Sequence, residues 1–231
     1  MHIFAISDLH LSGDPPFKPM SVFGEHWHDH WTKIKADWLE KVTPDDIVLL
    51  PGDISWAMKL EEALPDLRAI DALPGRKVIV RGNHDYWWQT VSKMTRVVGG
   101  QITFLHNTFT PAGPFAICGS RGWTCPGDRS FIEAEDMPIY LRELNRVRAT
   151  LTAAVQAGYR RHILMLHYPP VNDRHEPSGF TDLMEEFGVE ICVFGHLHDE
   201  AIHTAPTGIF GGAACYLVSC DALDFKLKCI V

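Results

Sequence analysis

The stretch Ile3-Phe4-Ala5-Ile6-Ser7-Asp8-Leu9-His10 begins with four apolar residues and ends in two potential metal ligands. Apolar runs rich in β-branched residues that end at a polar turn are typical of strands buried on both faces. The same layout recurs at four further places, where an apolar run leads into Gly52-Asp53, Gly82-Asn83-His84-Asp85, His167 or Gly195-His196-Leu197-His198. Open α/β sheets bind ligands beyond the carboxyl ends of their strands. The repeated placement therefore predicts one site at one edge of a sheet.

Segments with helical periodicity separate these runs. Apolar residues at three- and four-residue spacing predict helices over about 26–40 and 58–73, a third beginning at Asp85, and a long one over 132–157. The alternation of strands and helices favours βαβ units and a mainly parallel core sheet. The last third, residues 201–231, has short apolar stretches between Gly and Asp, which predict antiparallel strands in a second sheet packed on the first.

Composition indicates a globular protein. We expect a single domain over residues 1–231, because no Pro/Gly/Ser linker divides the chain. A hydrophobic content of 46% and a mean hydropathy of -0.05 are typical of soluble proteins, and the apolar runs are too short to cross a bilayer. The N-terminus leads directly into a strand, without the pattern of a signal peptide, so a cytoplasmic location without a membrane partner is the expectation.

The net charge of -8 argues against a broad nucleic-acid-binding surface, because no Lys/Arg cluster stands out to neutralise a phosphate backbone. An anionic substrate is still compatible with this charge. Bound divalent ions would reverse the sign of the potential locally.

The polar motifs offer a mixed set of carboxylate, amide and imidazole ligands. Such a set suits transition metals better than Ca or Mg, because imidazole is a poor ligand for the latter pair. The candidate ligands are Asp8, His10, Asp53, Asn83, His167, His196 and His198. Seven ligands exceed the need of one tetrahedral ion. They fit two divalent transition-metal ions, with Mn, Fe or Zn expected, that share one carboxylate.

In this order, Asp-x-His, Gly-Asp, Gly-Asn-His-Asp, a lone His and Gly-His-x-His resemble the signature of the calcineurin-like metallophosphoesterases. The chain is most similar to the small bacterial branch of that family, much of which has no assigned substrate. The resemblance implies an α/β fold with two packed mixed β-sheets flanked by helices, a four-layer α/β/β/α sandwich. It also implies that Asp8, His10 and His198 hold one metal, that Asn83, His167 and His196 hold the other, and that Asp53 bridges them.

The chemistry expected of such a centre is hydrolysis of a phosphomonoester or phosphodiester. Two nearby cations lower the pKa of a bridging water, so that a hydroxide can attack the phosphorus in line. His84 adjoins the ligand Asn83 but binds no metal in the family pattern, and its imidazole is suited to be the general acid. Asp85 either orients His84 or caps a following helix, and the capping role is the preferred interpretation.

The sequence departs from the protein Ser/Thr phosphatases of this superfamily, which continue Gly-Asp as Gly-Asp-x-Val-Asp-Arg-Gly. Trp56 and Ala57 take the places of the second Asp and the Arg here, which weakens that assignment. The opening residues 6–11 also resemble lipid A pathway pyrophosphatases, but the acidic stretch that follows Gly-Asp in those enzymes is missing. We predict that Arg121, in a Gly-flanked loop, neutralises the substrate phosphate instead. A solvated loop arginine is the equal alternative.

Two further segments attract attention. The run His26-Trp27-His28-Asp29-His30 looks like a metal cluster, yet on a helix only His26 and His30 would share a face. A surface helix is the preferred interpretation, and a cap over the substrate stays open. The loop over residues 169–179 follows His167 and could shape specificity.

Three functions are therefore compared. The first is a dimetal phosphoesterase acting on a small phosphate ester or a nucleotide-like substrate. The second is a protein-binding scaffold that keeps the fold and loses the chemistry, which the intact His84 disfavours. The third is a nuclease, which the acidic charge balance disfavours. The sequence does not indicate a preference for monoesters or diesters, or an oligomeric state.

Overall fold

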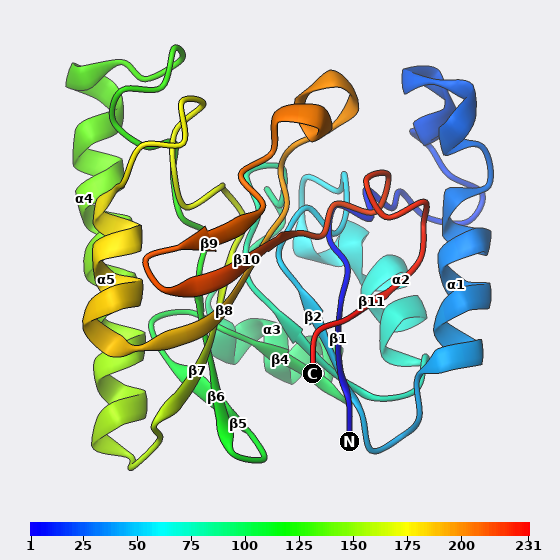
Figure 1. The fold of residues 1–231 in the computed structure, drawn as a ribbon. Coiled ribbons are helices and arrows are strands. Elements are labelled where there is room, and N and C mark those ends of the chain that lie inside the picture. The colour runs from blue at the N-terminus through cyan, green and yellow to red at the C-terminus, as the bar shows by residue number, and fades with distance from the viewer. The chain divides into compact units, whose positions relative to one another are not determined.

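The computed structural model describes residues 1–231, which divide into two compact units. The first unit comprises residues 1–104 and 218–231, and the second comprises residues 105–217. Each unit contains one mixed β-sheet with helices beside it (Figure 1). The two mixed sheets with flanking helices that the sequence predicts are thereby confirmed. A single domain over the whole chain stays a prediction.

The sheet of the first unit has five strands in the order β11-β1-β2-β3-β4. The strands are β1 Ile3–Ala5, β2 Ile47–Leu50, β3 Arg76–Ile79, β4 Ile102–Phe104 and β11 Lys228–Cys229. Neighbouring strands from β1 to β4 run parallel, and only β11 pairs in the antiparallel sense, with β1. The carboxyl ends of β1, β2 and β3 therefore lie at the same edge, where the first three polar motifs begin.

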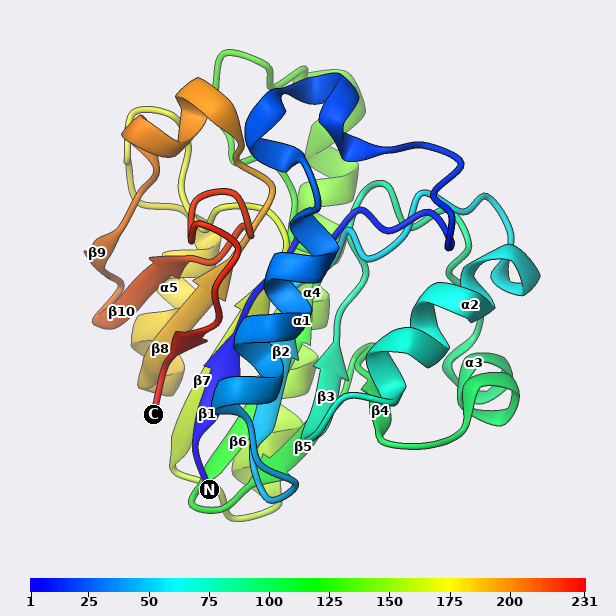
Figure 2. The same ribbon diagram turned by 90° about the vertical axis from the view of Figure 1, so that its right-hand side faces the viewer.

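Three α-helices and two short 3₁₀ turns complete the first unit (Figure 2). They are η1 Met20–Phe23, η2 Glu25–Trp27, α1 His30–Lys41, α2 Leu60–Asp71 and α3 Val91–Val98. Their apolar stripes pack against one face of the sheet, where Ile34, Leu67 and Met94 join Val48 and Leu50 in one core cluster. Burying these side chains supplies the main driving force for the unit, at about 1.5–3 kcal/mol for each large aliphatic residue.

The sheet of the second unit has six strands in the order β5-β6-β7-β8-β10-β9. The strands are β5 Phe109–Ala112, β6 Phe115–Ser120, β7 Arg161–Leu166, β8 Val189–Phe194, β9 Gly208–Phe210 and β10 Ala213–Leu217. The pairs β6–β7, β7–β8 and β8–β10 are parallel, whereas β5 and β9 pair antiparallel at the two edges. The last two polar motifs follow the adjacent strands β7 and β8.

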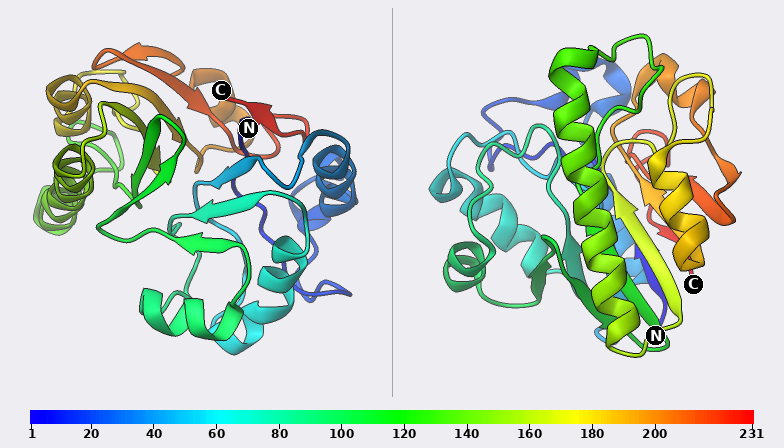
Figure 3. Two further views of the ribbon diagram at one scale, coloured as in Figure 1. Left: turned by 90° about the horizontal axis from the view of Figure 1, so that it is seen from below. Right: turned by 90° about the vertical axis from the view of Figure 1, so that its left-hand side faces the viewer.

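Helices α4 Glu133–Gln156 and α5 Gly179–Phe187 lie side by side on this sheet, and the 3₁₀ turn η3 Asp199–Thr204 follows β8 (Figure 3). Three acidic residues in the first turn of α4 favour its start, because they face the positive end of the helix dipole. The hydroxyl of Ser178 caps α5 by accepting hydrogen bonds from the backbone N–H groups of Phe180 and Thr181. The sequence patterns predict α4 to within one residue at each end and do not predict α5.

Two helices begin four or more residues after the predicted start, whereas α2 lies two residues inside the predicted 58–73 at each end. The helix expected from residue 26 begins at His30, because Asp29 adopts a left-handed conformation with φ of 53° that breaks the preceding turn. The helix expected from Asp85 begins at Val91, with Thr90 as its N-cap. The residues 26–30 therefore do not share one helix surface.

The arrangement of the strands also corrects two expectations. The five motif-bearing strands belong to two different sheets and do not line one edge of a single sheet. The strands of the last third do not form a sheet of their own, because β9 and β10 extend the sheet of β7 and β8 while β11 pairs with β1. None of the helices combines the length and low charge that a transmembrane span requires.

Candidate functional site

The loops after β1 and β2 are held together in the first unit by backbone hydrogen bonds. The N–H of Asp8 donates to the carbonyl of Gly52, and the N–H of His10 donates to that of Asp53, both at 3.0 Å. Asp8, His10 and Asp53 all adopt positive φ angles, of 59°, 46° and 52°. Non-glycine residues adopt this region rarely and at some cost. The loops thus hold three predicted ligands in unusual backbone conformations.

The carboxylate of Asp8 is fully buried and receives two hydroxyl hydrogen bonds. Ser7 Oγ and Ser219 Oγ both donate to its Oδ2, the latter at 3.2 Å. Ser219 lies just beyond β10 in the chain, so the bond joins residues 211 positions apart. These donors fix the orientation of the carboxylate, as the outer partners of metal ligands typically do.

The carboxylate of Asp53 contacts both His84 and His10. Its Oδ1 accepts a hydrogen bond from the N–H of His84 at 2.8 Å, and its Oδ2 lies 3.8 Å from Nε2 of His10. Asp8 offers a carboxylate oxygen within 4.8 Å of the ligand atoms of both His10 and Asp53. Three of the predicted metal ligands are therefore brought together within the first unit.

Asp85 is the hydrogen-bonding centre of these loops. Its fully buried carboxylate accepts from the backbone N–H groups of Gly82, Asp53, Ile54 and Ser55 and from the indole N–H of Trp87. Burial raises the pKa of this carboxyl, and the hydrogen bonds from the loop oppose that effect. Capping of a following helix, the interpretation preferred from the sequence, is wrong, because Asp85 holds the loop of Asp53. Its orientation of His84 stays a prediction.

The Gly82-Asn83-His84 turn packs tightly on Asp53. A Cβ atom on Gly82 would lie 2.0 Å from Oδ1 and 2.3 Å from the backbone nitrogen of Asp53, so only glycine fits. Asn83 follows directly, and His84 is tied to Asp53 through its own N–H. The turn therefore positions a predicted ligand and the predicted proton donor relative to the carboxylate of Asp53.

Trp56 is a component that the sequence patterns do not identify. Its ring stacks on His10 with centroids 4.5 Å apart and planes at 19°, and it lies 4.7 Å from the ring of His84. The indole thus contacts both a predicted ligand and the predicted general acid. The only signal in the sequence is that Trp56 takes the place of an acid in a related motif.

In the second unit, His167 and His196 converge at the ends of the adjacent strands β7 and β8. Nε2 of His167 and Nδ1 of His196 are 3.2 Å apart, and the N–H of Gly195 donates to the carbonyl of His167 at 3.1 Å. Ligands about 2.0–2.1 Å from a tetrahedral ion lie roughly 3.3 Å from each other. The separation of the two nitrogens fits joint binding of one ion. His198 lies two residues further on, as the residue preceding η3.

Arg121 adjoins His167 but is not a solvated loop residue. Its carbonyl accepts hydrogen bonds from the N–H groups of His167 and Tyr168, and its side chain is only 17% exposed. The guanidinium lies 4.4 Å from the ring centroid of Trp123 and 3.8 Å from the buried carboxylate of Glu143. The solvated alternative is therefore wrong. Binding of the substrate phosphate by Arg121 stays a prediction.

The donor set as a whole suits transition metals. The first unit contributes carboxylates and an imidazole that converge, and the second contributes a close pair of imidazoles. Oxygen and imidazole ligands together favour Mn, Fe or Zn over Ca or Mg. The residues present therefore fit the cofactor that the sequence predicts.

One protein family matches most of the chain. The sequence model of the calcineurin-like phosphoesterases matches residues 1–200. No curated protein sequence matches the chain. Among solved structures, the chain is similar to the protein of unknown function AQ665 from Aquifex aeolicus, with a TM-score of 0.46 and 16% identity over 99% of this chain and 95% of that one.

Proposed function

The chain belongs to the calcineurin-like phosphoesterase family, and from that membership we propose that it hydrolyses phosphate esters with two divalent transition-metal ions. The observation that carries the proposal is the convergence of Asp8, His10 and Asp53, with His84 held against the same aspartate. A mixed set of ligands with an adjacent imidazole is the arrangement that metal-assisted hydrolysis requires.

The ligands are assigned by motif. Asp8, His10 and His198 would hold one ion, Asn83, His167 and His196 would hold the other, and Asp53 would be shared. Mn, Fe or Zn suits these donors. When bound, such a pair of ions supplies Lewis acidity toward the phosphoryl group and a nucleophile at neutral pH.

His84 is the proposed general acid. Its backbone is fixed by the hydrogen bond to Asp53, and its ring is bounded by Trp56 at 4.7 Å and by Tyr86 at 6.3 Å. Imidazole titrates near neutral pH, so it can donate a proton to the oxygen of the leaving alcohol. Arg121 is the proposed partner of the phosphoryl oxygens in the second unit.

The proposed substrate is a small phosphate ester or a nucleotide-like compound. Trp56 and Ala57 stand where protein phosphatases carry an acid and an arginine, which argues against phosphoproteins. The net charge of -8 argues against extended nucleic acids.

The test is hydrolysis of p-nitrophenyl phosphate and of bis(p-nitrophenyl) phosphate by the purified protein supplied with Mn²⁺. His84→Ala should keep the metal content and lose a factor of about 10²–10⁴ in kcat, the usual contribution of general acid catalysis. His203→Ala, at an exposed histidine of η3, is the matched control and should change neither quantity. A protein that holds two ions per chain and hydrolyses neither ester would overturn the proposal and favour a scaffold.

A further inference from the structure

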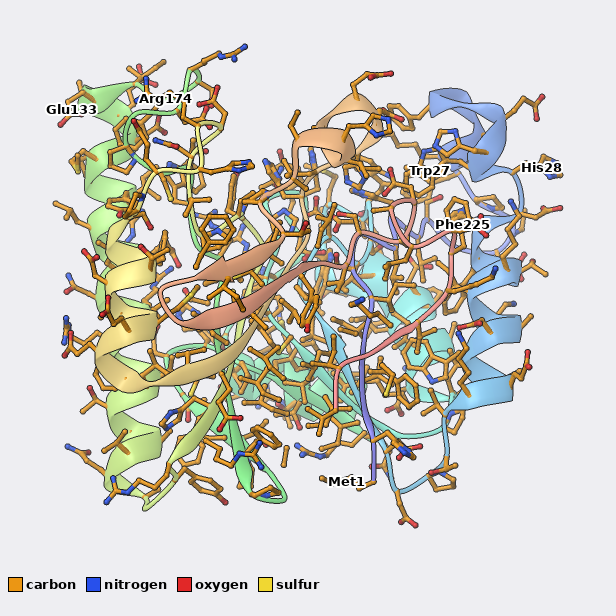
Figure 4. All side chains as sticks on the ribbon, in the orientation of Figure 1. Met1, Trp27, His28, Glu133, Arg174 and Phe225 are labelled. Atoms are coloured by element: carbon orange, nitrogen blue, oxygen red, sulfur yellow. The ribbon has the colours of Figure 1, made fainter.

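A pocket of about 430 Å³ lies in the first unit beside His10. Its walls come from residues 10–21, from the end of η2 and the first turns of α1 over residues 27–35, and from the middle of α2. Figure 4 shows Trp27 and His28 of this wall where the chain enters α1. Ligand sites typically measure 300–1,000 Å³ and combine apolar walls with a few polar groups. The pocket has that size, and His10 connects it to the proposed metal centre.

The pocket contains two lysines that pair with no carboxylate. Nζ of Lys18 lies 3.1 Å from the ring centroid of Trp56, and Nζ of Lys35 lies 5.5 Å from that of Trp31. Partial burial lowers the pKa of Lys18, as expected where a cation loses water without gaining an anion. Two half-buried cations over aromatic rings form a surface suited to a negatively charged ligand.

The acidic side chains of the pocket offer little competition for these lysines. Both oxygens of Asp66 are occupied, by the N–H of Gly13 at 2.8 Å and by Ser55 Oγ at 2.6 Å, and burial raises its pKa. Asp29 lies 3.0 Å from His28, and Asp14 is exposed. The one buried carboxyl of the pocket therefore already accepts a hydrogen bond at each oxygen.

His30 adds no positive charge to this wall. Its Nε2 lies 2.9 Å from the carbonyl of Leu9, and burial lowers its pKa. Lys18 and Lys35 are thus the groups that can select a ligand by charge.

The position of Lys18 links the pocket to the reaction. Trp56 carries Lys18 over its ring, stacks on the predicted ligand His10 and lies 4.7 Å from the proposed general acid His84. A substrate whose phosphoryl group is at the metal centre has its leaving alcohol near His84. The remainder of that alcohol can then extend past His10, which lines the pocket, toward Lys18.

We propose that this pocket binds a second anionic group, carried by the alcohol part of the substrate, with Lys18 as its main contact and Lys35 as a further one. The substrate class is a phosphate ester whose alcohol bears a carboxylate or another phosphate. This inference rests on the proposed phosphoesterase function. Lys18 and Lys35 determine specificity in it and take no part in bond cleavage.

The test uses two esters of matched shape, 4-carboxyphenyl phosphate and 4-carbamoylphenyl phosphate, which differ in charge. Lys18→Gln should reduce the ratio of their kcat/KM values about tenfold, the loss of one charge-assisted contact, and Lys35→Gln should reduce it less. Lys18→Arg should retain most of the ratio. Because the intrinsic reactivities of the two esters do not depend on the variant, the change in the ratio reports on the pocket.

Lys33→Gln is the matched control, because Lys33 lies on α1 like Lys35 but does not line the pocket. Its Nζ donates to the carbonyl of His26 at 3.1 Å. Its ratio should equal that of the wild type. Unchanged ratios in both Lys18→Gln and Lys35→Gln, with both esters hydrolysed, would overturn the pocket and leave the phosphoesterase function standing.

Binding to the metal-free protein separates the two proposals. Calorimetric titration should show tighter binding of 4-hydroxybenzoate than of 4-hydroxybenzamide, and Lys18→Gln should remove the difference. This result without turnover of either ester would support the pocket and count against the phosphoesterase function. Equal affinities for the two compounds in the wild type would overturn the pocket.

Discussion

The two units hold their predicted site residues by different means. In the first unit, Asp8, His10 and Asp53 have positive φ angles, and the buried carboxylate of Asp85 accepts from three backbone N–H groups of the Asp53 loop and from that of Gly82. In the second unit, His167 follows β7 directly and His196, itself at a φ of 72°, follows β8 after one glycine, so adjacent parallel strands bring the two rings together without a shared buried carboxylate.

The difference has an energetic consequence. Regular strands place residues through many equivalent hydrogen bonds, so the remaining bonds keep the strand in position when one bond is lost. The loops of the first unit depend on a few buried hydrogen bonds. Losing one of these bonds leaves a buried group unsatisfied, which costs about 1–3 kcal/mol. We therefore expect single substitutions to abolish metal binding more readily in the first unit than in the second.

The largest effect is expected for Asp85→Asn. The amide nitrogen cannot accept, so at least two of the N–H groups around residue 85 lose their partner, at a cost of about 3 kcal/mol or more. Metal content by elemental analysis should fall sharply, and the melting temperature should fall with it.

Glu143→Gln in the second unit is the matched variant for Asp85→Asn. Glu143 is equally buried and contacts Ser120, Arg146 and Arg121, none of which is a predicted metal ligand. The Glu143→Gln variant should have a lower melting temperature than the wild type and the same metal content. Equal loss of metal in both variants would remove the distinction between the two units.

A smaller but more local effect is expected for Gly82→Ala. The new methyl group would lie 2.0 Å from Oδ1 of Asp53, so this carboxylate must move and metal affinity should fall by about 10–100-fold. Gly179→Ala is the matched variant in the second unit, where the methyl group would meet Leu144 at 2.7 Å. It should destabilise the protein without changing the metal affinity measured by competition with a chelator.

The polar motifs of the site are predictable from the sequence because each follows an apolar run whose end can be read directly. The strands before Asp8, Asp53 and His167 are present, and the long helix over 132–157 is confirmed to within one residue at each end. Apolar runs do not, however, encode which strands pair. For this reason the sequence predicts that all five motifs lie at one edge of one sheet, whereas the strands that carry them belong to two sheets.

Other features depend on contacts between distant residues or on a single backbone angle. The hydrogen bond from Ser219 to Asp8 spans 211 positions, and nothing near Ser219 in the sequence indicates it. α1 starts late because Asp29 adopts a left-handed φ. An aspartate can also adopt helical φ angles, so the residue type does not indicate this break. The sequence alone also allows Asp85 to cap a helix. The structure excludes that role because α3 begins only at Val91, with Thr90 as its N-cap.

An intermediate effect is expected from Asp46, at the entry to β2. Burial alone would raise its pKa, but hydrogen bonds from His2 and Thr43 lower it from 3.8 to about 2. The folded state therefore binds the proton more weakly than the unfolded state, so Asp46 stabilises the fold above about pH 4 and loses this contribution as pH falls toward about 2. Asp46→Asn should flatten the dependence of the melting temperature on pH in this window.

The comparison for Asp46 is Glu190, where β8 begins in the second unit. Its pKa is also lowered, by hydrogen bonds from Arg161, but both side chains are exposed. Exposed pairs contribute little to stability. Glu190→Gln should leave the acid limb of the melting curve nearly unchanged, and a flattening equal to that of Asp46→Asn would contradict the assignment.

The smallest effect is expected for Ser219→Ala, which removes one of two hydroxyl donors from Asp8. Ser7 still donates to the same oxygen, so the carboxylate keeps its orientation in part, and the metal affinity should fall by about tenfold at most.

Ser178→Ala in the second unit removes a helix cap worth about 1 kcal/mol and should lower the melting temperature with no change in metal affinity. Chelator competition and thermal melts on both variants check this contrast. Because Ser219 reaches Asp8 from beyond β10, a reduced affinity would also show that this hydrogen bond from the C-terminal segment supports the metal centre.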